Sequence, residues 1–218
     1  PCSGEKASSQ ASDVVGKHSM RNCGTRSIPY RFIQPTAQGN YDQEILDFWF
    51  RELEPTQWWQ KDEQLDALIR RRFGHWHEQA MAGEWCAWRE SAAGSLAEVI
   101  ILDQFSRNIY RGKPESFLSD PMALALAQCA IAKEFDRALP PTERGFLYMP
   151  FMHSESRLIH EQAVKLFESL GNAHSLEFEY KHKRIIDRFG RYPHRNPILG
   201  RESSAEELEF LTQPDSSF

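Results

Sequence analysis

The sequence has no apolar stretch long enough to form a membrane-spanning helix. Its 218 residues contain only short apolar runs, such as Val99–Leu102, whereas a bilayer needs about 18 or more consecutive apolar residues. We therefore expect a soluble protein without a membrane partner.

Cysteine is scarce, and known cofactor motifs are absent. The four cysteines, Cys2, Cys23, Cys86 and Cys129, form no CxxC pair and no metal-ligand spacing. Free thiols among apolar residues fit a reducing compartment, so we expect a cytoplasmic protein. The sequence holds no phosphate loop, dinucleotide fingerprint, nucleophile elbow or HExxH motif. We expect no cofactor.

An excess of positive charge is also missing. The net charge is −5, and because residues 1–40 carry +3, residues 41–218 carry −8. Proteins that bind duplex nucleic acid use clustered Lys and Arg to neutralise phosphates. We therefore expect no duplex nucleic acid partner.

Residues 1–40 differ from the rest of the chain. They are rich in Ser, Gly and isolated charges and show no apolar periodicity, so burial cannot offset the entropy of ordering them. We predict a disordered or leader segment, with an organellar transit segment as the alternative. Residues 41–218 are predicted to form a single all-α domain.

Helix start and stop signals punctuate the remainder of the chain. The apolar spacing predicts a first helix that ends before Pro55, a second over about 61–82, and a third over about 95–110, opened by a capping box of Ser95 and Glu98. A fourth has Asp120 as N-cap, and a fifth, over 143–149, is cut by Pro150. Further helices run to Leu170, over about 175–189, and from Ser203 or Ser204. About eight helices with short connections predict stacked antiparallel hairpins.

The third predicted helix carries polar residues where burial is expected. Apolar residues cover nearly its whole circumference, yet Asp103 and Arg107 form one i,i+4 pair and Gln104 and Asn108 another. Buried polar groups of this kind must be paired. The pattern indicates either a structural network that clamps neighbouring helices or the polar floor of a pocket.

A second polar cluster follows Pro150. His153 is predicted to share a helical face with Arg157 and His160 and to act as a general base, oriented by Glu155 or Asp103. In the alternative interpretation the histidine only satisfies a neighbour's hydrogen bond.

Metal binding has weaker support. Glu179-x-x-His182 matches half of a di-iron bundle signature, but the second half is absent. His182 also shares a face with several apolar residues, so we expect a histidine at the edge of the core and no metal site.

The third polar cluster is a loop between two glycines, residues 190–200, and the arginine that follows it. Arginine forks suit carboxylate or phosphate groups, and binding residues concentrate on loops. The same side chains could instead tie the loop to acidic helix ends. The polar residues of this cluster are Arg191, His194, Arg195, Asn196 and Arg201.

Several of these segments together resemble one known family. The segments are Ile45-Leu46-x-Phe48-Trp49-Phe50, Leu102-Asp103-Gln104-Phe105-x-Arg107-Asn108, Tyr148 to Glu155, and Phe189 to Asn196 with Leu199-Gly200-Arg201. They resemble the bacterial family known as domain of unknown function 924, over about residues 43–218. The resemblance implies a TPR-like right-handed array of helical hairpins and no particular activity. The family's signature positions coincide with the polar residues named above, which favours one shared pocket.

Three hypotheses for function follow. The first is a binding module whose Arg and His residues hold an anionic small molecule or a peptide carboxylate. The second is a hydrolase or lyase with His153 as base and Arg107 or Arg195 stabilising negative charge. The third is a protein–protein scaffold that uses Trp58 and Trp59. The sequence predicts neither the ligand nor the oligomeric state.

Overall fold

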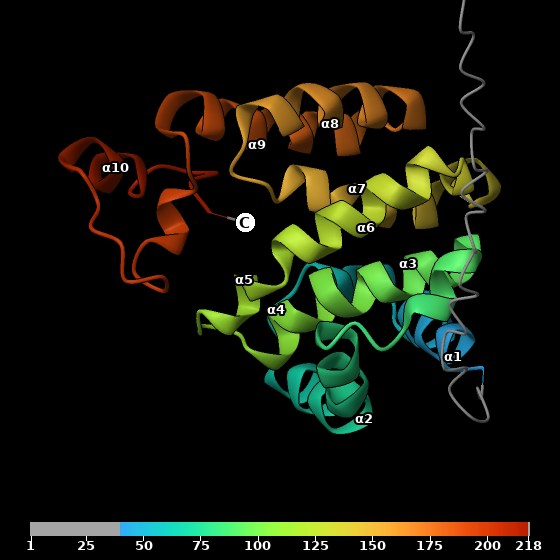
Figure 1. Cartoon of the computed structure of the whole chain (residues 1–218). Coiled ribbons are helices and arrows are strands. Elements are labelled where there is room, and N and C mark those ends of the chain that lie inside the picture. Colours follow the sequence, from blue (N-terminus) through green and yellow to red (C-terminus); the bar gives the residue numbers. More distant parts are fainter. Residues whose placement is uncertain (1–39, 218) are drawn as a thin grey trace, which may run out of the picture. The chain divides into compact units, whose positions relative to one another are not determined.

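The computed structural model describes residues 40–217, and within them every regular element is a helix (Figure 1). The all-α prediction is confirmed. The prediction of a disordered or leader segment at residues 1–40 falls almost wholly outside the described residues. No helix between residues 40 and 217 is both long and apolar enough to cross a bilayer.

The first half of the fold is built around one long buried helical rod. Helices α3 (Ala92–Ile100) and α4 (Ser106–Ile109) are joined by the π-helical segment η4 (Ile101–Phe105) without a break in helical backbone. The rod packs against α1 (Tyr41–Asp47), α2 (Glu63–Met81) and α6 (Asp120–Ala132). A second π-helical segment, η1 (Phe48–Glu52), extends α1.

The second half continues with consecutive helices that pack on one another. Helix α7 (Pro141–Met152) packs on α8 (Arg157–Leu170), and α8 packs on α9 (Ala173–Phe189). Only Gly171 and Asn172 join α8 to α9; Gly171 has φ 72° and the Asn172 side chain caps α9. Helix α10 (Ala205–Phe210) follows. Of its two predicted starts, Ser203 and Ser204, the structure has Ser204, which forms a capping box with Glu207. The single turn α5 (Glu115–Leu118) precedes α6.

Short 3₁₀ segments lie between the longer helices. They are η2 (Pro55–Trp58), η3 (Cys86–Glu90), η5 (Phe135–Ala138) and η6 (Pro193–Arg195). If α3, η4 and α4 are taken as one rod, eight α-helices longer than one turn lie within residues 40–217, as predicted. The TPR-like superhelix itself stays a prediction.

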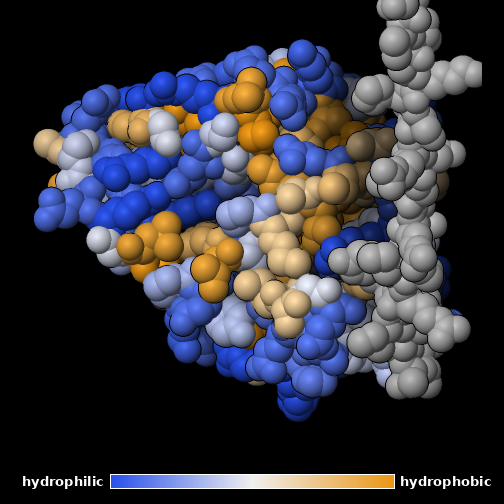
Figure 2. All heavy atoms as spheres, in the orientation of Figure 1, coloured by the Kyte–Doolittle hydropathy of each residue, from blue (hydrophilic) through white to orange (hydrophobic). Residues whose placement is uncertain are grey.

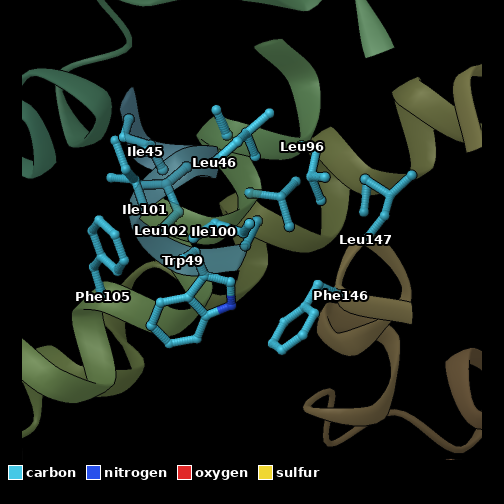
Figure 3. Packing of buried hydrophobic residues seen from close by; sticks show 14 of the residues in the cluster. Ile45, Leu46, Trp49, Leu96, Ile100, Ile101, Leu102, Phe105, Phe146 and Leu147 are labelled. Atoms are coloured by element: carbon cyan, nitrogen blue, oxygen red, sulfur yellow. The ribbon is translucent and has the colours of Figure 1, made fainter. Parts of the chain in front are cut away.

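The rod explains where the core lies. Leu96, Ile100, Ile101, Leu102 and Phe105 are fully buried, and Figure 3 shows them packed beside residues of α1, η1 and α7. Removing a side chain of this size from water contributes about 1.5–3 kcal/mol. In the view of Figure 2 the surface over α8, α9 and α10 is mainly hydrophilic.

Three local predictions were wrong. The capping box of Ser95 and Glu98 does not form, because the rod begins at Ala92 and the Ser91 side chain accepts the Gly94 N–H instead. Glu98 is fully buried and binds Arg89 through two hydrogen bonds of 2.6 and 2.7 Å. The fifth helix is not cut at Pro150, because α7 continues to Met152.

The third wrong prediction concerns Asp120. Ser119 precedes α6 and Asp120 is its first residue, so Asp120 is not the N-cap. Its carboxylate instead enters the polar network described below.

Candidate functional site

The centre of the candidate site is the π-helical turn η4. A π turn forms i→i+5 hydrogen bonds and widens the helix locally, and such turns are frequent at functional sites. Here it carries Asp103, which is fully buried, and Gln104, which is 8% exposed. The Gln104 amide donates to Asp103 Oδ2 at 2.5 Å.

His153 contacts the other oxygen of Asp103. It lies at the C-terminus of α7, and its Nδ1 is 2.7 Å from Asp103 Oδ1. A carboxylate accepts hydrogen bonds, so the proton of the neutral imidazole lies on Nδ1. Nε2 then carries a free lone pair, and among residues 40–217 it has no hydrogen-bond partner. The His153 side chain is 15% exposed and Asp103 1%. A base oriented by a buried carboxylate is an arrangement that can accept a proton from a substrate.

The surroundings of the pair favour a neutral His153 imidazole and an ionised Asp103 carboxylate. Burial lowers the pKa of His153, and the Arg107 guanidinium lowers it further, against the opposing effect of Asp103. Burial alone would raise the pKa of Asp103, but Arg107, His153 and the Gln104 amide hold it at about 2. At neutral pH the site therefore presents an ionised Asp103 beside an imidazole able to accept a proton.

Arg107 and Arg195 meet at one carboxylate, Asp120. Arg107 donates to both Asp120 oxygens at 3.0 and 3.1 Å and to the Asp103 backbone carbonyl at 2.6 Å. Arg195 donates to Asp120 Oδ2 at 3.1 Å and to the His153 carbonyl at 3.0 Å. Sequence analysis missed Asp120 as a site residue because a helix-start position before a proline was sufficient to explain it.

The Arg195 guanidinium lies between two aromatic rings. It is 4.6 Å from the Phe117 centroid and 4.7 Å from the Tyr192 centroid, an arrangement that stabilises a cation by ring stacking. Arg195 is 6% exposed, and its Nε is buried without a hydrogen-bond partner among residues 40–217. The loop thus fixes Arg195 against the backbone of His153.

A second network holds the rest of the C-terminal loop. Glu155 accepts two hydrogen bonds from Arg201, at 2.7 and 2.9 Å, and one from the Tyr192 N–H at 2.8 Å. Of the two acids predicted to orient His153, Asp103 makes the contact and Glu155 is bound to the loop instead. Arg201 also donates to Asn196 Oδ1 at 2.9 Å.

Arg191 lies at the far end of this second network. It donates to Glu207 at 2.6 and 2.8 Å, and Glu207 is the capping-box acid of α10. Asn196 Nδ2 is bonded to Ser203 Oγ at 3.0 Å and to Glu207 at 3.4 Å. These contacts match the alternative in which loop arginines tie the loop to an acidic helix end.

His194 has a different environment from the arginines beside it. Its Nδ1 is buried without a hydrogen-bond partner in the described part of the chain. Burial and the Arg195 charge lower its pKa to about 4, so the imidazole is neutral at pH 7.

Asn108 belongs to neither network. Its amide donates to Asp66 on α2 at 2.8 Å, and Asp66 is also bound by Arg111. The predicted side-chain pair of Gln104 and Asn108 does not form, because Gln104 is bonded to Asp103. Asn108 thus clamps α4 to α2.

His160 has the features of a structural histidine. It does not share a helix with His153, because α7 ends before His153 and α8 begins at Arg157. Both of its nitrogens are used: Nδ1 is 2.8 Å from Glu179 and Nε2 is 2.9 Å from the Ser154 carbonyl. His160 and Glu179 are fully buried.

In the sequence, Glu179 and His182 match half of a metal-binding signature, although we expect no metal site there. His182 is 6% exposed, and its Nδ1 is 2.8 Å from the Phe178 carbonyl. Between residues 40 and 217 no three His, Cys, Asp or Glu side chains are placed to hold one metal ion.

The structure therefore sorts most of the predicted residues into two networks. The first contains Asp103, Gln104, Arg107, His153 and Arg195 together with Asp120, and the second contains Glu155, Arg191, Asn196 and Arg201 with Glu207. His194 and Asn108 belong to neither network.

Comparison with known proteins identifies the family. The model of the family described as "Bacterial protein of unknown function (DUF924)" matches residues 45–215. The chain belongs to the DUF924 family. Both networks lie inside the matched range.

A solved structure from this comparison agrees with the fold. The chain is similar to the protein of unknown function ATU0120 from Agrobacterium tumefaciens, with 37% sequence identity and a TM-score of 0.76. The similarity covers 79% of this chain and 97% of the other. No curated protein matches the chain.

Proposed function

We propose that this DUF924 protein is an acid–base enzyme in which His153 Nε2 accepts a proton from a small molecule or from a water that attacks it. The observation that carries the proposal is the asymmetry of the imidazole. Nδ1 is bound to a buried carboxylate at 2.7 Å, while Nε2 has no partner within residues 40–217. The proposed reaction class is hydrolysis or elimination.

Comparison with His160 supports this reading over a purely structural one. His160, which has the features of a structural histidine, uses both nitrogens and is fully buried. Within residues 40–217 His153 Nε2 has no hydrogen-bond partner, and the His153 side chain is 15% exposed although its carboxylate partner is buried. A low pKa also suits a base that must be unprotonated at neutral pH.

Four other residues of the first network have a role in this proposal. Asp103 fixes the tautomer and stabilises the imidazolium once His153 is protonated. Arg107 is held by Asp120 and by the Asp103 backbone carbonyl, and its charge helps to lower the pKa of His153. Asp120 and Arg195 are positioning residues, because they hold Arg107 and the His153 backbone.

The anion-binding hypothesis has less support from these contacts and stays a prediction. Each of the four arginines contacts a carboxylate: Arg107 and Arg195 bind Asp120, Arg201 binds Glu155, and Arg191 binds Glu207. Guanidinium groups already compensated by carboxylates offer little net charge to a further anion. The scaffold hypothesis is likewise still a prediction; Trp59 is 64% exposed.

A general probe of imidazole reactivity tests the proposal without knowledge of the substrate. The probe is 4-nitrophenyl acetate, whose hydrolysis is followed by absorbance for the parent protein and three variants. His153→Gln should lower the rate about 100-fold, the lower end of the range for a positioned base. Asp103→Asn should lower it less, because the imidazole remains. His174→Gln is the matched control, since His174 is an exposed helical histidine.

The pH dependence gives a second criterion. Activity should fall as the pH drops through the pKa of His153, which lies below the ordinary value of 6.5. A rate that His153→Gln leaves unchanged in a folded protein, judged by circular dichroism, would exclude the proposal. A midpoint at or above pH 6.5 would contradict the lowered pKa of His153.

A further inference from the structure

A groove between α9 and α10 lies apart from the two polar networks. Its cavity volume is about 490 Å³, within the roughly 300–1,000 Å³ typical of small-molecule sites. It is lined by Lys181, Arg184, Ile185, Arg188 and Phe189 from α9, by Phe210 from α10, and by Pro214 and Asp215 beyond α10. Its chemistry is mixed, with three cations, one carboxylate and four apolar side chains.

The three cations share one side of α9. Lys181, Arg184 and Arg188 are separated by three and four residues, which places them one above another on the helix surface. Like charges at this spacing repel one another unless acids or a ligand compensate them.

Acids compensate two of the three cations. Lys181 lies 3.2 Å from Asp215 and 3.6 Å from Glu177, and Arg188 lies 2.8 Å from Glu206. Arg184 has no hydrogen-bond or ion-pair partner within residues 40–217. The groove therefore carries one uncompensated guanidinium, unlike either polar network.

The apolar wall of the groove is built from two aromatic rings. Phe189 and Phe210 have centroids 5.1 Å apart, and the Arg188 guanidinium lies 4.7 Å from the first and 5.8 Å from the second. Ile185 is 4% exposed and packs in the same small hydrophobic cluster. A flat apolar group could contact these rings while its charged end reaches Arg184.

We infer that the α9–α10 groove binds a small organic anion with a flat apolar body, which places its carboxylate, sulfonate or phosphate against Arg184 and its rings against Phe189 and Phe210. The guanidinium fork suits two oxygens of such an acid. The inference is independent of the chemistry proposed for His153.

The fluorescent anion 8-anilinonaphthalene-1-sulfonate is a suitable probe, because it joins a sulfonate to an aromatic body. Titration of the full chain should give a saturable rise in fluorescence with one site per chain. Arg184→Glu should weaken binding at least about tenfold, and Arg184→Lys should retain most of it, because the charge remains. Arg71→Glu is the matched control, since Arg71 is an exposed arginine on another helix, α2, and does not line the groove.

A second probe separates charge from apolar contact. N-phenyl-1-naphthylamine has the same aromatic body without the sulfonate, so it should bind at least about tenfold more weakly. Equal affinity of the parent and Arg184→Glu for the sulfonate, equal affinity of the parent for both probes, or no saturable binding would each overturn the inference. His153→Gln should bind the sulfonate like the parent, so this test and the test at His153 fail separately.

Discussion

At the scale of single residues, Asp120 holds the first network together. One carboxylate, 13% exposed, accepts hydrogen bonds from both Arg107 and Arg195. If its charge is removed, both guanidinium groups lose their shared counter-ion in a partly dry environment, and Arg107 keeps its ion pair with Asp103. Loss of one partner from a buried pair is far more costly than loss of a surface pair.

We therefore predict that Asp120→Asn lowers the free energy of unfolding by about 3 kcal/mol. The control is Asp187→Asn, which removes a carboxylate that is 47% exposed and paired with Lys183 on the surface of α9. That change should cost less than about 1 kcal/mol. Urea denaturation of the three proteins measures both values. Equal losses in the two variants would show that Asp120 has no special role.

At the scale of elements, the start of the central rod depends on a close backbone approach. The Gly94 backbone lies against the 3₁₀ turn η3, and a Cβ at this position would overlap the Trp88 carbonyl and lie 2.9 Å from the Trp88 Cα. Backbone atoms cannot move aside as a flexible side chain can. Glycine at position 94 therefore sets how closely η3 and α3 pack.

Gly94→Ala should accordingly destabilise the fold, by about 1–3 kcal/mol as for other overpacked sites. Gly145→Ala is the comparison, because it also adds a methyl group inside a helix but meets only Leu170 Cδ2 at 3.5 Å, an ordinary contact. That variant should be more stable than the parent by roughly 0.5–1 kcal/mol through helix propensity. Thermal denaturation gives the direction in which each variant changes the melting temperature. A change in the same direction for both variants would refute this account of Gly94.

Sequence patterns predicted the C-terminal ends of two helices better than the start of the central rod. Helical spacing and αL glycines placed the C-termini of α8 and α9 at Leu170 and Phe189, because both signals are local. The start of the rod was misplaced, since Ser91 and Ser95 both precede plausible helical turns. Only tertiary packing decides between them.

Tertiary packing also decides how the residues of the candidate site pair with one another. Asp103 and Arg107 were predicted from an apolar helix, His153 from the cluster after Pro150, and Arg195 from the loop after Gly190. The four residues share one network. Which residue faces which could not be derived, because periodicity does not reveal the π turn that sets the direction of Asp103. Asn108 and Glu155 accordingly have different partners from those expected.

At the scale of the whole molecule, several buried histidines make stability depend on pH. Burial lowers the pKa of His77 and His153, and it lowers that of His182 to about 3 and that of His194 to about 4. The unfolded chain binds protons at these residues below about pH 6.5, while the folded chain does not. Stability should therefore fall as the pH decreases from about 6.5 towards 4. Glu179, whose pKa is raised by burial, acts in the opposite direction above pH 4.5.

We predict that His194→Gln flattens this dependence. Each neutral buried histidine adds up to about 1.4 kcal/mol per pH unit to the slope between its folded and unfolded pKa values. Urea unfolding of parent and variant at pH 7, 6 and 5 measures the slope. His75→Gln serves as the control for loss of a histidine, because His75 is exposed on α2. A variant that keeps the parent slope between pH 6 and 5 would contradict the assignment to His194.

The most direct test of the proposed function is an NMR titration of the His153 imidazole in ¹⁵N-labelled protein. At neutral pH the nitrogen shifts should show a proton on Nδ1 and a free lone pair on Nε2, and the pKa should lie below 6.5. A proton on Nε2 would contradict the account, because Nε2 could not then accept a proton at neutral pH, and a pKa at or above 6.5 would contradict the effect assigned to burial and Arg107.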